Sequence, residues 1–455
     1  MRLALSEPLD RSVRSICGRI REAGGRAYLV GGCVRDLLLG IPVLELDLEV
    51  FSLEAESLEK LFPDAMDFVG KSYGIYRFRE MPIDLGLPRE ERPTGPGHRD
   101  FAVRVDPTMS LELAAARRDF TVGAIYLDPL EGSPIDPFGG TKDLEKRILR
   151  HVSAHFSEDP LRVLRAMQLS ARFHFSMDPE TVRLCRSIGA ENLSPERIYG
   201  EFSKLILRGE AIGSGLEFLR QCDWLRFFPE LAALVHCPQD PFFHPEGNVW
   251  EHVKLAMDAF AQFRPPARED ALVVGFAVLC HDLGKPERTE RGQDGRIRTP
   301  GHGPAGVPIA KGFLQNMRTP KEIIRSVLPL VAHHMLPRTF SCPTPATVGA
   351  VRRLALAVGR IDLLLAVARC DNRGRTQTTF NFSGEDRLEE IARAEGLLRN
   401  PPVPLVRGRD LLGSFPPSPE LGALLRRLFE EQLDGKFSSR EEGLRLAQKY
   451  YVHYK

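Results

Sequence analysis

The spacing of hydrophobic and polar positions changes near residue 155 of this 455-residue chain. After that point apolar residues recur every three or four positions, which predicts one helix after another. Before it, short apolar or alternating runs bounded by glycine and proline predict strands. These runs are 26–32, 45–50, a pair at 74–78 and 81–87, and 119–129. The pattern predicts a head of mixed strands and helices on a long α-helical body.

Proline- and glycine-rich stretches interrupt this pattern at three places. The charged stretch 88–100 predicts a mobile loop within the head. The His- and Pro-rich stretch 236–248 separates two helical blocks, and 400–406 predicts a linker before a last helical unit. We therefore expect more than one domain, as the chain length also suggests.

Composition places the chain among ordinary globular proteins, with 43% hydrophobic and 27% charged residues. No apolar run reaches the roughly 18–20 residues that a membrane span needs, and the first residues lack the apolar core of a signal peptide. The net charge of +1 indicates no general attraction to nucleic acid, so an RNA ligand would need a local basic surface. Eight cysteines occur singly, which favours reduced thiols and a cytoplasmic protein.

The run ELDLEV alternates acidic with apolar residues. On a strand Glu45, Asp47 and Glu49 would share one face, which is typical of either a solvated sheet surface or a metal site. Asp84 lies in a second alternating run, and carboxylates on adjacent strands that face one pocket suit two Mg²⁺ ions for displacement at phosphorus. A glycine pair at 31–32, between a strand and a helix, suits close approach to phosphate.

Arginine and aspartate also cluster downstream of this strand. Arg117, Arg118 and Asp119 precede an apolar run, and such dense charge suits a triphosphate or ribose. Asp159, Arg162 and Arg165 recur every three residues on a predicted helix. An Asp acceptor beside an Arg fork can pair with the edge of a base, although an i,i+3 surface salt bridge is an equal alternative. The amphipathic run at 195–206 favours structural packing.

Taken in order, these stretches resemble the class II tRNA nucleotidyltransferase (CCA-adding enzyme) and bacterial poly(A) polymerase family over roughly residues 25–230. The matching motifs are LVGGCVRDLLLG, ELDLEV, VGKSYGIYRF with PIDLGLPREE, RRDFTVGAIYLDP, EDPLRVLRAMQLSARF and SPERIYGEFSKLI. The resemblance implies a DNA-polymerase-β-like nucleotidyltransferase head, an α+β fold class, and template-independent addition of CMP and AMP from CTP and ATP to the tRNA 3′ end with Mg²⁺. An RRFxLxH stretch typical of poly(A) polymerases is absent, which favours tRNA as the partner.

Site residues follow from the same resemblance. Glu45 and Asp47 match the metal-binding Asp-x-Asp pair, and Asp84 matches the third catalytic carboxylate. Strand alternation alone would equally allow Asp47 and Glu49 to be the metal-binding pair. The residues matched to nucleotide binding are Gly31, Gly32, Arg35, Arg117, Arg118, Asp119, Asp159, Arg162 and Arg165. Two positions depart from the family pattern, with Glu45 in place of Asp and Gly123 in place of Asn.

A second group of candidate ligands lies between residues 244 and 371, which hold six of the twelve histidines. A His–Asp doublet that ends an apolar helix suits a divalent metal, which can activate water toward a phosphoester. The segment resembles the HD phosphohydrolase domain, which implies metal-dependent phosphatase or 2′,3′-cyclic phosphodiesterase activity on damaged tRNA ends. The matched ligands are His252, His281, Asp282, His334 and Asp371, with His302 close by and His333 less favoured.

We therefore expect a nucleotidyltransferase head (1–152), a helical neck and body (153–235), an HD domain (236–395) and a helical tail (396–455). Basic residues of the tail suit the tRNA backbone, although a solvated helix pair explains them equally well. The main hypothesis is a bifunctional tRNA 3′-end maturation and repair enzyme. The alternative is mainly an HD phosphohydrolase with an attenuated or partial head, for which Glu45 and Gly123 argue. A third hypothesis, a non-catalytic RNA-binding protein, would leave both candidate metal sites unexplained.

Overall fold

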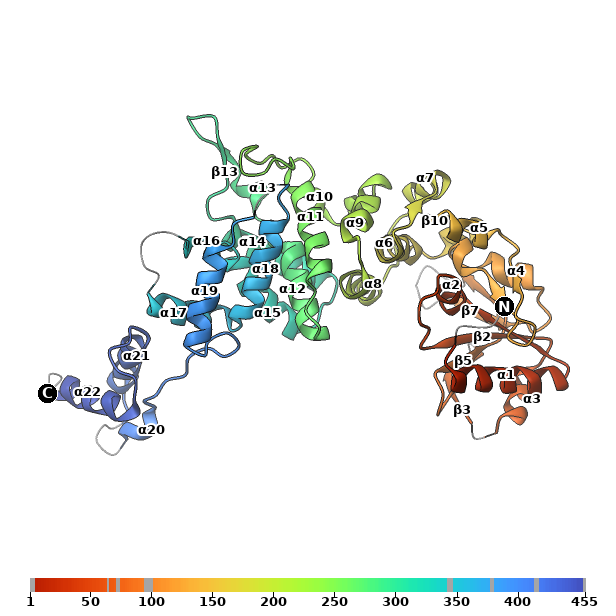
Figure 1. The fold of residues 1–455 in the computed structure, drawn as a ribbon, viewed down its shortest axis with the longest axis horizontal. Helices are drawn as coiled ribbons and strands as arrows, with labels where there is room; N and C mark the ends of the chain where they lie inside the picture. Colours follow the sequence, from red (N-terminus) through yellow and green to blue (C-terminus); the bar gives the residue numbers. More distant parts are fainter. Residues whose placement is uncertain are drawn as a thin grey trace. The chain divides into compact units, whose positions relative to one another are not determined.

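The computed structural model describes residues 5–63, 65–70, 74–93, 101–341, 347–376, 380–412 and 417–452. The chain forms two compact units, Met1–Phe227 and Phe228–Lys455 (Figure 1). The first unit contains a mixed sheet and helices, and the second is almost entirely helical, so the expected α+β class is confirmed. Within the described residues, no helix is both long enough and apolar enough to cross a membrane.

A seven-stranded sheet forms the centre of the head, in the order β3-β4-β5-β2-β1-β8-β9. Its strands are β1 (Arg26–Val30), β2 (Leu46–Phe51), β3 (Met66–Gly70), β4 (Ile75–Phe78), β5 (Ile83–Gly86), β8 (Tyr126–Leu127) and β9 (Pro134–Ile135). The helices of the head are α1 (Glu7–Glu22), α2 (Gly32–Leu38), α3 (Ala55–Leu61), α4 (Leu111–Ala116) and α5 (Gly140–Glu145). The predicted pairing of 74–78 with 81–87 is confirmed as the antiparallel pair β4–β5.

The register of β2 decides which side chains reach the same face of the sheet. β2 is antiparallel to β1 and parallel to β5, and Asp47 lies directly opposite Asp84. Leu46, Leu48 and Val50 are buried on the other face, as the alternating sequence predicts. The acidic residues of β2 therefore stand on the face that carries Asp84.

Two predictions about the head are wrong in part. Residues 89–93, expected in a loop, form β6 (Arg89–Pro93), which pairs with β7 (Phe101–Val105); the rest of that loop lies outside the described residues. The run 119–129, expected to be a strand, contains a 3₁₀ turn at Thr121–Gly123 and only the two-residue strand β8. This turn is covered by α5, whose Gly140 lies so close to the Thr121 backbone that a Cβ would clash.

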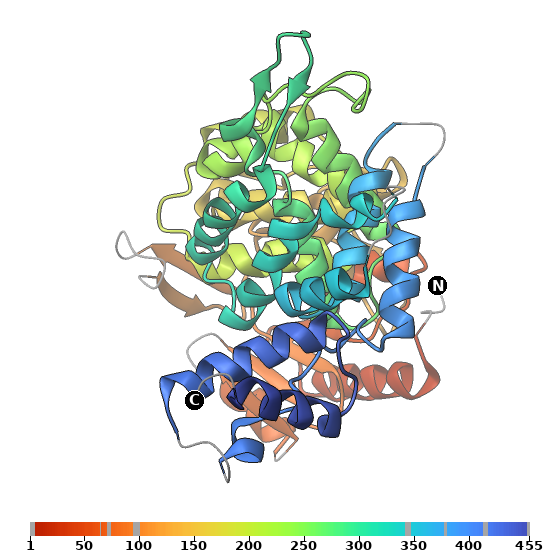
Figure 2. The ribbon, with the colours of Figure 1, turned by 90° about the vertical axis from the view of Figure 1, so that its left-hand side faces the viewer.

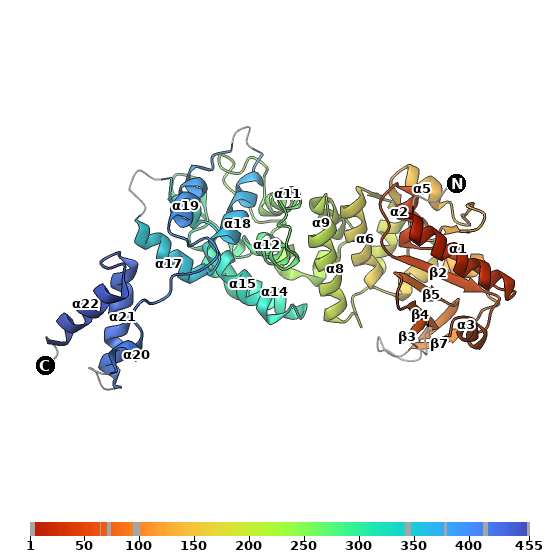
Figure 3. The same ribbon diagram turned by 60° about the horizontal axis from the view of Figure 1, so that its bottom comes forward.

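The helical part of the first unit follows the sheet. It contains α6 (Leu161–Phe173), α7 (Pro179–Ser187), α8 (Pro195–Arg208) and α9 (Ile212–Gln221), after the short parallel pair β10 (Ile148–Leu149) and β11 (Ser176–Met177). Figure 3 shows α6, α8 and α9 side by side, and α6 is packed against both of the others. Gly215 of α9 permits this close packing, since a Cβ there would meet the backbone oxygen of Met167 on α6 at 2.5 Å.

The second unit is built around α12, a helix whose residues from Ala271 to Cys280 are all buried. A helix that is apolar on every side is typical of the centre of a bundle. Its helices before the tail are α10 (Pro229–Ala232), α11 (Val249–Gln262), α12 (Arg268–Cys280), α13 (Lys285–Arg288), α14 (His302–Asn316), α15 (Lys321–His333), α16 (Leu336–Thr339), α17 (Val348–Val358), α18 (Ile361–Arg373) and α19 (Ser383–Ala394). A hairpin of β12 (Glu290–Arg291) and β13 (Ile297–Arg298) projects from this bundle (Figure 2).

The tail has its own small core between α20 (Gly408–Leu411), α21 (Pro419–Leu433) and α22 (Arg440–Val452). Three of its basic residues are used in packing: Arg440 pairs with Asp410, Lys436 pairs with Glu431, and Arg427 stacks on Tyr450 at 3.6 Å. All seven described cysteines are buried and free, as predicted for reduced thiols.

Candidate active sites

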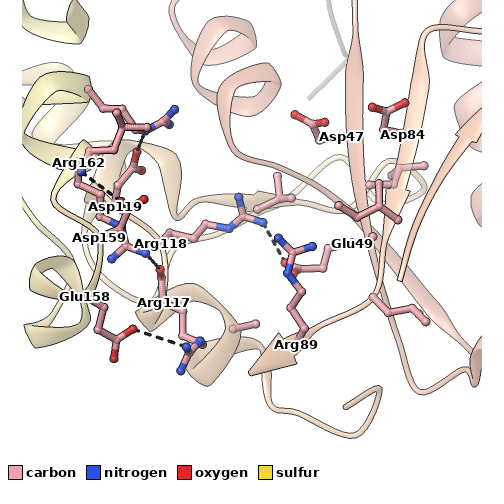
Figure 4. Close-up of a pocket in the computed structure, with 18 of the residues that line it drawn as sticks. Asp47, Glu49, Asp84, Arg89, Arg117, Arg118, Asp119, Glu158, Asp159 and Arg162 are labelled. Carbon is pink, nitrogen blue, oxygen red and sulfur yellow. Dashed lines mark hydrogen bonds and ion pairs between the residues drawn. The ribbon is translucent and has the colours of Figure 1, made fainter. Parts of the chain in front are cut away.

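A pocket of about 780 Å³ opens on the head beside the carboxylate face of the sheet (Figure 4). Its walls come from β2 and β5, the segment after α4, the start of α6 and the first turn of α8. Six of the residues predicted for nucleotide binding line it: Arg117, Arg118, Asp119, Asp159, Arg162 and Arg165. The folding of the head thus brings together charges that are more than 110 positions apart in sequence.

Asp47 and Asp84 lie side by side at one wall of this pocket (Figure 4). Burial raises the pKa of Asp47, and the negative charges of Asp84 and Glu45 raise it further, while Arg118 lowers it. Arg77 partly neutralises the pair, because its guanidinium binds both oxygens of Asp84 at 2.8 and 2.7 Å. Asp47 and Asp84 lie opposite each other on adjacent strands and repel each other, and together they supply the carboxylate oxygens that Mg²⁺ prefers as ligands.

Glu45 and Glu49 occupy different surroundings. Glu45 is exposed, stands one residue before β2 and is not among the residues that line the pocket, although its charge acts on Asp47. Glu49 lines the pocket, and its Oε2 accepts hydrogen bonds from Arg118 at 3.1 Å and from the Tyr126 hydroxyl at 2.6 Å. Glu49 therefore holds the arginine at the pocket rather than offering a vacant carboxylate.

The glycine pair lies next to this arginine. Gly31 has a φ of +78°, and a Cβ there would come within 3.2 Å of Arg118 Nη1, so glycine lets the guanidinium lie against the turn. Gly32 begins α2. Arg35, which we expected at the triphosphate, is buried, pairs with Asp36 at 2.6 Å and stacks over Phe173; it is not among the lining residues.

The opposite wall carries ion pairs that differ from the predicted ones. Asp159 precedes α6 instead of lying on it, and it pairs with Arg197 at 2.7 Å. The alternative prediction, an i,i+3 salt bridge between Asp159 and Arg162 on one helix, is therefore wrong. Arg162 donates to the backbone oxygens of His155 and Arg117. The helix begins only at Leu161 because Pro160 occupies the position before it and the Asp159 backbone is extended.

Asp119 and Arg165 form the best-buried pair of this wall. Burial alone would raise the pKa of Asp119, but the Arg165 guanidinium, 2.6 Å away, holds it below its usual value. Gly123, where the family has asparagine, leaves room beside this pair, because a Cβ there would lie 3.4 Å from Asp119 Oδ1.

Sequence reasoning missed Arg197 and Glu158 at this pocket. Arg197 lies in the first turn of α8, in the run assigned to structural packing, and its side chain reaches Asp159. Glu158 lies 3.6 Å from Arg117. The available signal was charge. The helix dipole disfavours a positive side chain in the first turn of a helix, so an arginine at this position indicates a partner outside the helix.

In the second unit six predicted ligands meet in one buried group, called here the HD cluster: His252, His281, Asp282, His302, His334 and Asp371. They come from five places in the bundle, namely α11, the end of α12, the start of α14, the end of α15 and the last turns of α18. Each side chain is 8% exposed or less. His333 is half-buried and stays outside the cluster, in agreement with its lower ranking.

All four histidines of the cluster present the same nitrogen to its interior. Nδ1 of His281, His302 and His334 meets the backbone oxygens of Val278, Thr299 and Val331 at 2.7–2.8 Å, and Nδ1 of His252 meets Glu246 Oε1 at 2.8 Å. These oxygens only accept, so Nδ1 carries the proton and Nε2 of the neutral ring carries a lone pair. Such outer partners are typical of metal-binding histidines.

The lone pairs need a cation between them. Nε2 of His302 lies 3.1 Å from Nε2 of His334, and two lone pairs at this distance repel unless a proton or a metal ion is shared. Asp282 has both carboxylate oxygens buried without a hydrogen bond of good geometry, although Lys285 forms an ion pair with one of them. The donor set therefore fits a divalent metal, with two groups of three that share Asp282: His252–His281–Asp282 and Asp282–His302–His334.

Three residues around the cluster were not predicted. Glu246 bridges His252 and His244, each at 2.8 Å. Lys285 donates to Gln239 at 2.7 Å and Arg338 donates to Asp371 at 2.9 Å. In the sequence, only their position within a few residues of a candidate ligand points to these three residues. That position does not distinguish them from charged side chains that face solvent.

Comparison with known proteins agrees with this picture for most of the chain. Residues 27–150 match the family model described as "Poly A polymerase head domain", and residues 174–234 match "Probable RNA and SrmB- binding site of polymerase A". The multifunctional CCA protein of Tolumonas auensis is 38% identical over 330 residues, which are 70% of this chain and 77% of that protein. The chain belongs to the multifunctional CCA protein family. Its relative from Alkalilimnicola ehrlichii is 36% identical over 77% of this chain and 84% of the relative.

Solved structures show that the fold extends over the whole chain. The CCA-adding enzyme of Bacillus stearothermophilus, solved in complex with CTP, has a TM-score of 0.66 at 21% identity and covers 99% of both chains. The enzyme of Thermotoga maritima, complexed with tRNA_CCA, has a TM-score of 0.60 at 18% identity and covers 98% of this chain and 96% of that one. At these identities the likeness concerns the fold alone, and this family member shares it from end to end.

Proposed function

We propose that this member of the multifunctional CCA protein family adds CMP and AMP from CTP and ATP to the 3′ end of tRNA. The observation that carries the proposal is the pairing of Asp47 with Asp84 at one wall of a pocket whose other wall presents arginines. Carboxylates for metal ions and cations for a triphosphate thus meet in one cavity large enough for a nucleotide. The closest support for the substrates comes from relatives of this family and from the CTP and tRNA complexes of proteins with the same fold.

The reaction is a displacement at the α-phosphorus of the nucleotide. The 3′-hydroxyl oxygen of the RNA forms a bond to that phosphorus, the bond to the bridging oxygen breaks, and pyrophosphate leaves while the hydroxyl proton passes to water. Asp47 and Asp84, with Glu45 nearby, would hold Mg²⁺, which when bound neutralises charge on the attacking and leaving oxygens. Arg118, held by Glu49, which Tyr126 also holds, would face the triphosphate, and positioning would supply much of the remaining acceleration.

Nucleotide choice depends on the wall formed by Asp119, Arg165, Asp159 and Arg197. Each arginine is held by a carboxylate in a nearly fixed orientation, so the wall presents acceptors and donors at set positions. A base whose hydrogen-bonding edge does not match would leave buried polar groups unpaired, which is costly. The protein itself would therefore select cytosine and adenine without a template.

Replacement of Asp159 by alanine is expected to reduce this selection. The discrimination of CTP and ATP against UTP and GTP should fall about tenfold or more, because an acceptor is lost and Arg197 is released. The measurement is kcat/KM for each of the four nucleotides on the same tRNA. The control is Asp223→Ala, which removes an exposed carboxylate paired with Arg226 in the same unit; equal discrimination in both variants would contradict the assignment.

For the second unit we propose metal-dependent phosphohydrolase activity on phosphorylated RNA ends. The support is the HD cluster, in which four inward-facing Nε2 atoms surround the buried Asp282, which also pairs with Lys285. His252, His281, Asp282 and Asp371 would hold one divalent ion, and Asp282, His302 and His334 would hold a second. Such ions supply charge that stabilises an attacked phosphoryl group and lowers the pKa of water.

In this hydrolysis a water oxygen forms a bond to phosphorus and the ester P–O bond breaks. The products of a phosphomonoester are phosphate and an RNA end with a free hydroxyl, and a 2′,3′-cyclic phosphate opens to a monoester. A free 3′-hydroxyl is the nucleophile that the head requires, so the second activity would prepare damaged ends for the first. The proposal is tested by supplying a tRNA that lacks its CCA end, with and without a terminal phosphate, and measuring nucleotide incorporation.

A further inference from the structure

A row of four charged residues crosses the sheet of the head at one register. Asp67 on β3 lies opposite Arg77 on β4, and Arg77 lies opposite Asp84 on β5. Asp84 in turn lies opposite Asp47 on β2. Residues directly opposite each other on neighbouring strands share a face of the sheet, and their side chains interact. The two carboxylates proposed as metal ligands therefore continue a row whose next member is an arginine.

Of its two acidic neighbours in this row, Arg77 binds Asp84. Its Nε and Nη2 donate to Oδ1 and Oδ2 of Asp84 at 2.8 and 2.7 Å, whereas Asp67 is paired with Arg79. One planar guanidinium thus holds both oxygens of Asp84, which is the strong form of such an ion pair. Asp84 lines the pocket of the head and Arg77 does not, so the guanidinium approaches the carboxylate from outside the pocket.

The charge of Arg77 bears on the metal site because, among the described residues, no other cation contacts its two carboxylates. Within the described chain Asp47 forms no ion pair, and Arg118, which also lines the pocket, is paired with Glu49 at 3.1 Å. Arg77 therefore cancels one of the two negative charges that Asp47 and Asp84 offer to a cation. The side chains of Arg77 and Asp84 are 59% and 29% exposed, and an exposed pair adds little to folding stability. The consequence of this pair thus lies mainly in the charge beside the pocket.

We propose that Arg77 lowers the affinity of the Asp47–Asp84 pair for Mg²⁺, so that it tunes the metal site of the head through Asp84. The inference rests on the nucleotidyl transfer proposed above and adds a control on its metal. Each carboxylate oxygen has two lone-pair positions, and the guanidinium uses one on each oxygen of Asp84. A cation that binds Asp84 must either share it with a nearby positive charge or displace one of the two N–H donors. Both costs weaken the binding of the cation.

The test uses the full chain and two variants of this arginine. Arg77→Gln removes the charge, and Arg77→Lys keeps the charge but cannot hold both oxygens with a planar fork. The matched control is Arg79→Gln, since Arg79 is two residues away, is 53% exposed and pairs with Asp67 outside the pocket. Binding of Mn²⁺ is titrated by electron paramagnetic resonance without nucleotide or RNA, and the head site is the one that Asp47→Asn removes. The Mg²⁺ concentration for half-maximal CMP addition and kcat at saturating Mg²⁺ are measured separately.

Arg77→Gln is expected to tighten Mn²⁺ binding at the head site about tenfold and to lower the half-maximal Mg²⁺ concentration by a similar factor, with kcat changed less than about threefold. Arg77→Lys should show a smaller change, Arg79→Gln should behave as the wild type, and added salt should narrow the difference. Unchanged or weaker Mn²⁺ binding in Arg77→Gln, or a wild type without an Asp47-dependent site, would overturn the inference. A lower kcat and melting temperature without tighter metal binding would do the same, because they indicate a purely structural pair. If Mn²⁺ binding tightens but no chain adds CMP, the control on the metal stands and the proposed nucleotidyl transfer does not.

Discussion

Replacing Asp47 by asparagine is expected to reduce nucleotide addition to tRNA by about 10³-fold or more. The carboxylate opposite Asp84 is the group best placed to hold a metal ion, and loss of several kcal/mol of transition-state stabilisation corresponds to this factor. Hydrolysis at the HD cluster should be unchanged, because it depends on side chains of the other unit. Incorporation of labelled CTP measures the first activity and phosphate release measures the second.

The same substitution should not destabilise the protein. Partial desolvation and the negative charges of Asp84 and Glu45 raise the pKa of Asp47 in the folded state above its unfolded value, so the ionised group slightly disfavours folding at neutral pH, and a neutral asparagine removes that effect. The melting temperature of Asp47→Asn should equal or exceed that of the wild type when both are measured without metal. Asp67→Asn, an exposed carboxylate of the same sheet that pairs with Arg79, serves as the control and should keep full activity. A fully active Asp47→Asn would contradict the assignment.

The reverse pattern is expected for Asp282→Asn. Asp282 is the residue that both groups of three ligands share, so its loss affects either metal position. Hydrolysis of phosphorylated ends should fall by about 10³-fold or more, while nucleotide addition to a tRNA with a free 3′-hydroxyl continues at the wild-type rate. Metal content, determined by mass spectrometry of the purified chain, should fall in parallel with hydrolysis.

Asp294→Asn is the control for this variant, because Asp294 is an exposed carboxylate of the β12–β13 hairpin that pairs with Arg298. If Asp282→Asn also stopped addition to tRNA with a free 3′-hydroxyl, the model of two separate sites would be wrong. Retention of both metal and hydrolysis would instead show that the HD cluster is a structural group of histidines.

Much of the head could be predicted because its signals are local. The alternation of β2 determines which residues share a face, and the structure has Leu46, Leu48 and Val50 buried as expected. The position of Asp84 opposite Asp47 depends on which strands pair and in which register, and the spacing of charges does not contain that information. The surroundings of Glu49 were missed for the same reason, since Arg118 and Tyr126 reach it from distant positions.

Local pattern was misleading where tertiary packing decides the conformation. The three-residue spacing of Asp159, Arg162 and Arg165 predicted one helical face, but Asp159 precedes the helix and pairs with Arg197 of α8 instead. In the second unit the candidate ligands chosen from the sequence do come together in one buried group. Their grouping around Asp282, and the hydrogen bond from Arg338 to Asp371, became visible only in three dimensions.

Incubation of the purified chain with Mg²⁺, a tRNA lacking its CCA end, and labelled CTP and ATP tests the central claim most directly. The account predicts the ordered incorporation of two CMP residues and one AMP, no incorporation of UMP or GMP when those nucleotides are supplied, and loss of incorporation in Asp47→Asn. No incorporation by the wild type, together with release of phosphate from a phosphorylated tRNA end, would contradict the claim and leave phosphohydrolysis as the main activity.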